Sequence, residues 1–244
     1  MRAIHTLSVV QLTYMPRLFP VNCYLVEEED SVTLIDAALP NNVGAILQAA
    51  ESIGKPIGHI VLTHAHSDHV GALDGLKQRL PHVPVLISRR DARLLAGDKT
   101  LAHDEPDKPI RGAVPSTITT KPDSLLEDGD LVGSLRAIAT PGHTPGSMSF
   151  LDERNGIVIA GDAFQTRGGI AVSGQMRWTF PFPAMATWSP ELALQSAKKL
   201  AALSPSVLAV GHGNMLEQPL AEMERAIARA ERTLDSGRRE HNVT

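Results

Sequence analysis

The sequence is poor in the features that would place a protein outside the cytoplasm. It contains one cysteine, Cys23, so no disulfide can form within the chain and a reducing compartment fits. No apolar run approaches the roughly 18 residues that a membrane-spanning helix needs. Polar residues also interrupt the N-terminal segment, where a signal peptide would carry its apolar core. We therefore expect a soluble, cytoplasmic protein in which Cys23 is a small buried strand residue.

The balance of charge excludes further classes of partner. Lysine and arginine together number 23, against 27 aspartate and glutamate, and the net charge is −4. Since the chain shows no basic stripe, we expect neither nucleic acid nor a membrane as a partner. We expect a small-molecule substrate instead, and the sequence leaves open whether the protein forms homo-oligomers.

The chain alternates strand and helix patterns without a linker that would divide it. We expect a single domain over residues 1–244, with its core at about 22–213 and a C-terminal helix at about 216–236. Helices are predicted over 40–53, 70–80 and 89–97 and from residue 190 onward, and the stretches 97–123 and 163–188 are predicted to be irregular. Strands are predicted within 22–39, 58–63, 83–88, 133–140, 147–153, 156–162 and 206–213.

The segment LTHAHSDHVG, residues 62–71, gathers metal-ligating side chains directly after an apolar strand. His64 and His66 lie two positions apart, so at the end of a strand they point to the same side. Asp68 and His69 follow in the turn that leads to a helix. Neutral imidazole and carboxylate groups are ligands that metals of the zinc type prefer. The segment therefore predicts two adjacent metal sites, which need further ligands from elsewhere in the chain.

Three further candidate ligands have the same placement. His143 follows an apolar strand within ATPGHTPGS, Asp162 ends the strand segment GIVIAGD, and His212 lies at the end of SVLAVGHG. Each of these residues alone would be read as a strand cap or a surface side chain. Because all of them follow strands, we expect them to converge with the first segment at one edge of the sheets.

This set of motifs, from about Asn22 to Gly213, resembles the metallo-β-lactamase-fold hydrolase superfamily. The resemblance implies an α+β fold, a four-layer αβ/βα sandwich of two mixed β-sheets flanked by helices. It also implies two divalent metal ions, with zinc as the first expectation, although iron and manganese fit the same ligands. By this resemblance one ion would be held by His64, His66 and His143, the second by Asp68, His69 and His212, and both by a bridging Asp162.

Two aspartates have additional expected roles. Asp36, in TLIDAAL, matches an aspartate that the family places behind the metal site, where it would orient a ligand histidine. A simple strand cap is the alternative for this residue. Asp68 is the expected catalytic residue, because between two ligands it would orient a metal-bound hydroxide and shuttle its proton. The implied reaction is hydrolysis of an ester, thioester or lactone carbonyl by a dinuclear enzyme.

The bridging Asp162 makes the chain more similar to the glyoxalase II and lactonase-like branch than to members that act on β-lactams. Gln165 stands where acyl-homoserine lactonases often have a tyrosine, and the residues after His212, 213–244, suit one helix rather than a glutathione-binding domain. Two alternatives stay open. One is a mononuclear-iron persulfide dioxygenase on the same scaffold, and the other is a metal-binding protein without turnover.

Aromatic residues are scarce, at 4% of the chain, and five of the nine fall within the stretch 163–188. Trp178, Phe180 and Phe182 are predicted to line the substrate site, as part of a lid over an apolar acyl or thioester group. A dimer contact or plain packing is the alternative for this stretch. Arg167 and Arg177 lie in the same stretch and are expected to be solvated, and contact with a substrate carboxylate or phosphate is the alternative for them.

Overall fold

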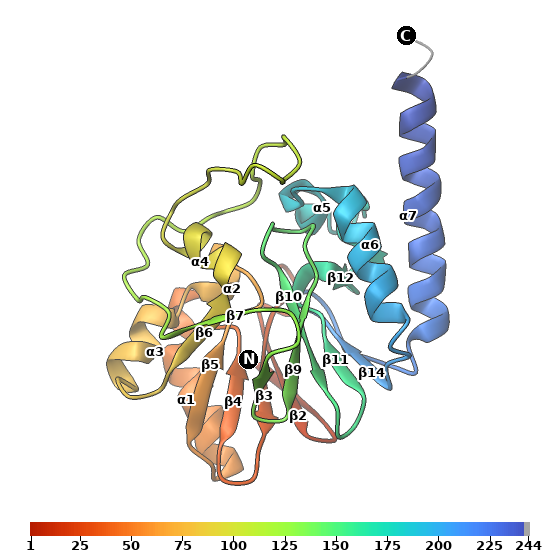
Figure 1. The fold of residues 1–244 in the computed structure, drawn as a ribbon. Coiled ribbons are helices and arrows are strands. Elements are labelled where there is room, and N and C mark those ends of the chain that lie inside the picture. Colours follow the sequence, from red (N-terminus) through yellow and green to blue (C-terminus); the bar gives the residue numbers. More distant parts are fainter. Residues whose placement is uncertain (242–244) are drawn as a thin grey trace.

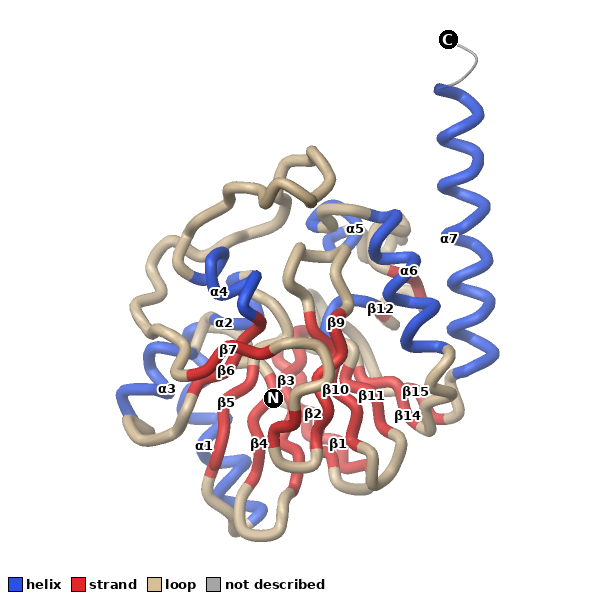
Figure 2. The backbone as a smooth tube through the Cα atoms, viewed as in Figure 1, coloured by secondary structure: helices blue, strands red, loops and turns tan. Residues whose placement is uncertain are grey.

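The computed structural model describes residues 1–241, and the side chains of residues 1–237. Two mixed β-sheets pack face to face, and helices cover the outer face of each (Figures 1 and 2). Helices α1 (Val43–Ile53) and α3 (Leu73–Arg79) lie on one side, and α6 (Pro190–Ala201) and α7 (Leu220–His241) on the other. The predicted four-layer αβ/βα sandwich is confirmed.

The first sheet has seven strands in chain order. Its first four strands pair antiparallel, and β4 to β7 pair parallel. The short helix α4 (Arg89–Leu95) follows the sixth strand, and the 3₁₀ turn η1 (Pro40–Asn42) precedes α1. The strands are β1 (Arg2–Thr6), β2 (Val9–Tyr14), β3 (Val21–Glu27), β4 (Val32–Ile35), β5 (Ile57–Val61), β6 (Val85–Ser88) and β7 (Ser124–Leu126).

The second sheet has six strands in the order β15-β14-β11-β10-β9-β8. Only β11 and β14 pair parallel, and the other pairs are antiparallel. A separate two-stranded hairpin joins β12 (Phe164–Gln165) to β13 (Ala171–Val172). The six strands are β8 (Leu131–Val132), β9 (Leu135–Ala139), β10 (Met148–Asp152), β11 (Ile157–Ile159), β14 (Val207–Ala209) and β15 (Leu216–Glu217).

Strand β3 shows how the sequence builds the layers. Successive side chains of a strand point to opposite faces of the sheet. Cys23 and Leu25 therefore pack in the cluster under α1 and α3, while Tyr24 and Val26 pack against the second sheet. Both faces of β3 are buried, so the strand is apolar along nearly its whole length, as expected for a central strand.

The N-terminal segment corrects the expected start of the core at about residue 22. Residues 2–14 form β1 and β2, and every residue of β2 is buried. Gln11 and Thr13 alternate with apolar residues in this strand, a pattern typical of a strand with one polar face, yet the structure buries both faces. Gln11 is nevertheless satisfied inside the protein, because its side-chain amide donates to the carbonyl of Gly213 at 2.7 Å.

The C-terminal helix also differs from its expected bounds. It begins at Leu220 rather than near 216, because Leu216–Glu217 pairs with β14 as strand β15. It continues beyond the expected end near residue 236, through Gly237 to His241, and residues 242–244 lie outside the described part of the chain. Within residues 1–241, no helix combines the length and the apolar character needed to cross a membrane.

Candidate metal centre

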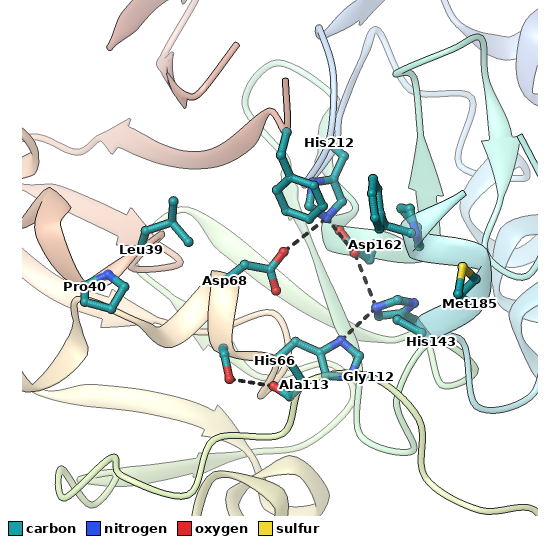
Figure 3. Close-up of a pocket in the computed structure, with 15 residues that line it drawn as sticks. Leu39, Pro40, His66, Asp68, Gly112, Ala113, His143, Asp162, Met185 and His212 are labelled. Atoms are coloured by element: carbon teal, nitrogen blue, oxygen red, sulfur yellow. Dashed lines mark hydrogen bonds and ion pairs between the residues drawn. The ribbon is translucent and has the colours of Figure 1, made fainter. Parts of the chain in front are cut away.

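The candidate ligands lie where strands of both sheets end. His64 and His66 follow β5, and Asp68 and His69 belong to the short helix α2 (Ser67–Val70). His143 lies in the loop between β9 and β10, and the two remaining candidates follow β11 and β14. Asp162 is placed by a 3₁₀ turn, η2 (Gly161–Ala163), and His212 by the loop after Ala209. Figure 3 shows ligands from these separate segments facing one another.

The structure brings all seven candidate residues into three overlapping groups, in each of which the potential ligand atoms lie within 4.8 Å of one another. Asp162 lies between the other groups, since its Oδ2 is 3.3 Å from His143 Nε2 and 3.2 Å from His212 Nε2. Asp68 Oδ2 is 3.5 Å from His212 Nε2. The groups are His64, His66 and His143; His64, His69 and Asp162; and Asp68, His69 and His212.

Every imidazole of the cluster has its outer nitrogen engaged by a second partner. His64 Nδ1 lies 3.0 Å from Thr63 Oγ1, and His69 Nδ1 lies 2.7 Å from Asp36 Oδ2. His66 Nε2 lies 3.0 Å from the carbonyl oxygen of Arg111, and His143 Nδ1 lies 2.9 Å from Ser173 Oγ. His212 Nδ1 lies 2.7 Å from the carbonyl oxygen of Pro20. Such partners fix the tautomer and turn the opposite nitrogen inward, as metal-ligating histidines require.

Three of the ligand atoms that point into the cluster indicate whether it fits metal ions. His64 Nε2, His69 Nε2 and Asp162 Oδ1 are buried and have no hydrogen-bond partner. Leaving a buried polar atom unpaired costs on the order of 1–3 kcal/mol. Coordination of a cation would remove that cost at all three atoms. The donor set of imidazole and carboxylate therefore fits divalent ions of the zinc type.

The field at the cluster also favours a cation. Burial lowers the pKa of His143 to about 3. Burial has the same effect on His69, but the carboxylates of Asp162, Asp36 and Asp68 outweigh it and raise its pKa to about 10. The pKa of Asp162 falls well below its usual value, because His212, His69 and His143 outweigh the opposing effect of burial. Positive charge is therefore stabilised beside these carboxylates, and a metal would take that place from the proton on His69.

Asp36 lies behind the cluster and holds two ligands. Its carboxylate accepts the hydrogen bond from His69 Nδ1, and it also accepts from the backbone N–H and the hydroxyl of Thr63, both at 2.8 Å. Because the Thr63 hydroxyl in turn contacts His64, Asp36 orients one ligand directly and another through Thr63. Asp36 also has a left-handed backbone, with φ of 63°, a conformation that aspartate tolerates better than most residues.

Asp91 is a buried carboxylate that joins two ligand loops and was not predicted from the sequence. Its Oδ2 accepts from Ala65 N at 2.9 Å and from Thr144 Oγ1 at 2.7 Å, and its Oδ1 accepts from Gly146 N at 2.8 Å. Ala65 separates His64 from His66, and Thr144 follows His143. The only local signal was the Ser88 N-cap, whose hydroxyl accepts from Asp91 N, and that signal describes a helix start rather than a site.

A cavity of about 470 Å³ opens onto the cluster. His66, Asp68, His143, Asp162 and His212 contribute to its wall, and no lysine or arginine among residues 1–237 does. Its apolar wall comes from two sides of the molecule. One side consists of Phe19, Leu39 and Pro40. The other side is helix α5 (Phe182–Ala186), which contributes Phe182, Pro183, Met185 and Ala186.

The three aromatic residues predicted to line the site have different outcomes. Phe182 lines the cavity, with half of its side chain exposed. Phe180 is buried behind it, where its ring lies 5.3 Å from Phe182 and 5.4 Å from His212. Trp178 is 89% exposed and outside the cavity wall. The expectation is therefore corrected for Phe180 and Trp178, and Phe19 supplies an aromatic wall that the sequence did not indicate.

The chain is similar to known proteins over most of its length. The family model described as the metallo-beta-lactamase superfamily matches residues 16–212. YobT of Bacillus subtilis is 61% identical over 232 residues, which are 95% of this chain and 100% of YobT. The probable metallo-hydrolase YflN of the same organism is 32% identical, covering 79% of this chain and 80% of YflN. The hydroxyacylglutathione hydrolase GloC of Haemophilus influenzae is 28% identical over 62% of this chain and 70% of its own length.

A solved structure shows the same likeness. The crystal structure of TTHA1623 in a di-iron-bound form aligns with a TM-score of 0.64 and 28% sequence identity. The alignment covers 86% of this chain and 95% of that one.

Proposed function

The chain belongs to the metallo-beta-lactamase superfamily of metal-dependent hydrolases, and we propose that it hydrolyses an ester, thioester or lactone with two divalent ions at the candidate metal centre. The observation that carries the proposal is the pair of three-residue ligand groups on either side of Asp162. Zinc is the proposed metal, and the ligand set accepts iron or manganese as well.

When bound, a pair of divalent ions supplies a water of lowered pKa and polarises the carbonyl of the substrate. The side chains around it have separate tasks in this proposal. Asp68, whose side chain is 22% exposed at the cavity, is the general base that orients the attacking water and accepts its proton. Asp162 holds the two ligand groups at a fixed separation, and Asp36 keeps the imidazole of His69 in its required tautomer.

The cavity wall supports a neutral, small-molecule substrate with an apolar group next to the carbonyl. Phe19, Leu39, Phe182 and Met185 offer apolar surface, and among the described residues no lysine or arginine side chain lines the wall to pair with an anionic group away from the metal ions. GloC is named for a glutathione thioester, so a thioester belongs among the candidates. The wall of this cavity supports an uncharged thioester over one with a carboxylate-bearing carrier.

The second ligand group favours the hydrolase over the mononuclear-iron dioxygenase. A single ion at His64, His66 and His143 would leave Asp68, His69 and His212 without a function. Iron itself does not separate the two, since the TTHA1623 structure is described as di-iron-bound. The number of metal ions per chain separates them, because the dioxygenase needs one and the proposed hydrolase needs two.

The test combines metal analysis with a substrate panel. Purified protein loaded with zinc is assayed on p-nitrophenyl butyrate, a short acyl thioester and a γ-lactone, and its metal content is measured. Asp162→Asn should lose one or both metal ions and at least about a hundredfold of kcat/KM, by the cost of removing a charged group from a preorganised site. His82→Asn, at an exposed histidine, is the matched control and should retain both. Full activity in Asp162→Asn, or no turnover by a chain carrying two metal ions, would refute the proposal.

A further inference from the structure

A second hollow, of about 350 Å³, lies between helix α7 and the segment that follows the β12–β13 hairpin. It shares no lining residue with the cavity at the metal centre. Three of its lining side chains are arginines, namely Arg177, Arg229 and Arg232. The remainder of the wall consists of Gln175, Met176, Thr233 and Ser236, none of which carries a charge.

Two of these arginines are fixed in place by one backbone carbonyl. Arg177 and Arg229 both donate to the oxygen of Ile170, Arg229 at 2.9 Å, so two like charges meet at a single acceptor. The Nε atoms of both guanidinium groups are buried and have no hydrogen-bond partner. Arg177 is therefore not the solvated residue that its sequence suggested. The shared carbonyl therefore holds the two guanidinium groups close together at the wall of the hollow.

The three arginines of the hollow have no carboxylate partner among the described side chains. Within residues 1–237, no carboxylate forms an ion pair with Arg177, Arg229 or Arg232, whereas the neighbouring Arg225 is paired with Glu222 at 3.0 Å. Burial, followed by the charges of Arg177, Arg232 and Arg225, lowers the pKa of Arg229. Like charges held together in this way repel one another. A bound anion would attract each of the arginines and so offset that repulsion.

We propose that this hollow binds a small phosphate-bearing anion. The planar guanidinium group presents paired N–H donors that match the oxygens of a phosphate, and Arg is the residue that proteins use for such recognition. In this arrangement the guanidinium groups of Arg177 and Arg229 that line the hollow meet the oxygens of the anion, and the exposed Arg232 adds a third positive charge at the rim. The site is separate from the metal centre, and it stands whether or not the proposed hydrolase activity is found.

The test uses inorganic phosphate and the zinc-loaded full chain at constant ionic strength, with chloride as the reference anion. Isothermal titration should show saturable phosphate binding to the wild type. Arg229→Gln should weaken it about tenfold or more, which is the effect of losing one charge-assisted hydrogen bond. Because Arg229 also holds Ile170, its replacement tests structure as well as binding. Arg232→Gln removes an exposed charge that makes no such contact, and should weaken binding by several-fold in a fully folded protein.

Arg225→Gln is the matched control, since it removes the same charge from the same helix but lies outside the wall of the hollow. It should change phosphate affinity less than about twofold, as expected for a charge acting only through solvent. Equal losses in all three variants would mean that net charge alone is sensed, and would overturn the site. Unchanged binding in Arg229→Gln and Arg232→Gln would place the phosphate elsewhere, at the metal centre for example, and an absence of binding to the wild type would equally overturn the proposal.

Discussion

Replacing Gly112 with alanine should disturb the long 97–123 loop in two ways. It strains a left-handed backbone position, and it removes the space that the loop leaves for a metal ligand. Gly112 has a φ of +82°, and a Cβ built there would lie 2.3 Å from His66 Nε2 and 2.5 Å from its Cε1. His66 has little room to retreat, because its Nδ1 is 3.0 Å from His143 Nε2 and its ring stacks edge-on against His64 at 4.8 Å. Either the loop or the imidazole must move.

The size of the effect follows from two separate terms. A non-glycine residue in the left-handed region costs on the order of 1–2 kcal/mol of folding stability. Displacing His66, and breaking its hydrogen bond to the carbonyl of Arg111, should lower metal affinity about 10- to 100-fold, the usual cost of disturbing a partner behind a ligand. Gly112→Ala should therefore lose both stability and metal affinity.

Gly97 provides the matched control within the same loop. Its φ is +85°, but a Cβ there would meet only the carbonyl of Pro115, at 4.0 Å. Gly97→Ala should share the loss of about 1–2 kcal/mol in urea unfolding while its zinc affinity, measured by competition with a chromophoric chelator, stays within about twofold of the wild type. If Gly112→Ala bound zinc as tightly as Gly97→Ala, the close approach of the loop to His66 would have no role in holding the ligand.

Three further predictions test the supports of the site and of the fold. Asp91→Asn should destabilise the protein by about 1–3 kcal/mol in urea unfolding, because an amide cannot accept from all three donors that the carboxylate holds; an unchanged midpoint would contradict this. Free zinc at 100 times its Kd should raise Tm by about 5–10 °C, reversed by chelator, since it stabilises the folded state by about 2.7 kcal/mol; a Tm insensitive to zinc would count against a metal centre. Burial opposes the lowered pKa of Asp152, but hydrogen bonds from Arg154 and Ser8 outweigh it. The folded pKa thus lies below the unfolded one, so this stability is complete at neutral pH and falls away below about pH 4. Asp152→Asn should unfold with a smaller difference between pH 7 and pH 3 than the wild type, and equal differences would refute the assignment.

The positions of the candidate ligands could be predicted because each depends on a local pattern. An apolar strand followed by a histidine or aspartate is visible within a few residues, and parallel strands end at the same edge of a sheet. His64, His143 and His212 follow strands in this way, and the structure brings them to one place. The four-layer sandwich was predicted from the resemblance to the metallo-β-lactamase fold, and the alternation of strands and helices agrees with it, whereas the N-terminal strands were not predicted. Strand β2 carries the buried Gln11, whose side-chain amide depends on a partner far along the chain, the carbonyl of Gly213.

The cavity wall was harder to predict, because it is built from residues that are apolar and common. Phe180 and Phe182 are two positions apart in one segment, yet a short helix, α5, turns one ring into the core and leaves the other at the cavity. Phe19 reaches the same cavity from the N-terminal part of the chain, where its ring lies 5.3 Å from Phe180. Nothing in the residue types distinguishes these outcomes. The tertiary path of the backbone decides them.

The groups that hydrogen-bond the outer nitrogens of the ligand histidines are harder to predict from the sequence than the ligands themselves. Two of the five imidazoles are held by backbone carbonyls, those of Arg111 and Pro20, which any residue at these positions could supply. Two more are held by the hydroxyls of Thr63 and Ser173, residues that are abundant and usually unrelated to a site. Only Asp36 presents a group whose chemistry is distinctive, and it is the one support that the sequence suggested. The ligands are constrained by residue type because the metal requires imidazole and carboxylate, whereas their supports are constrained by position, since any oxygen at hydrogen-bond distance fixes the tautomer. Variants that shift the backbone, such as Gly112→Ala, should therefore disturb this centre more than side-chain replacements at Arg111 and Pro20, whose backbone carbonyls accept the hydrogen bonds.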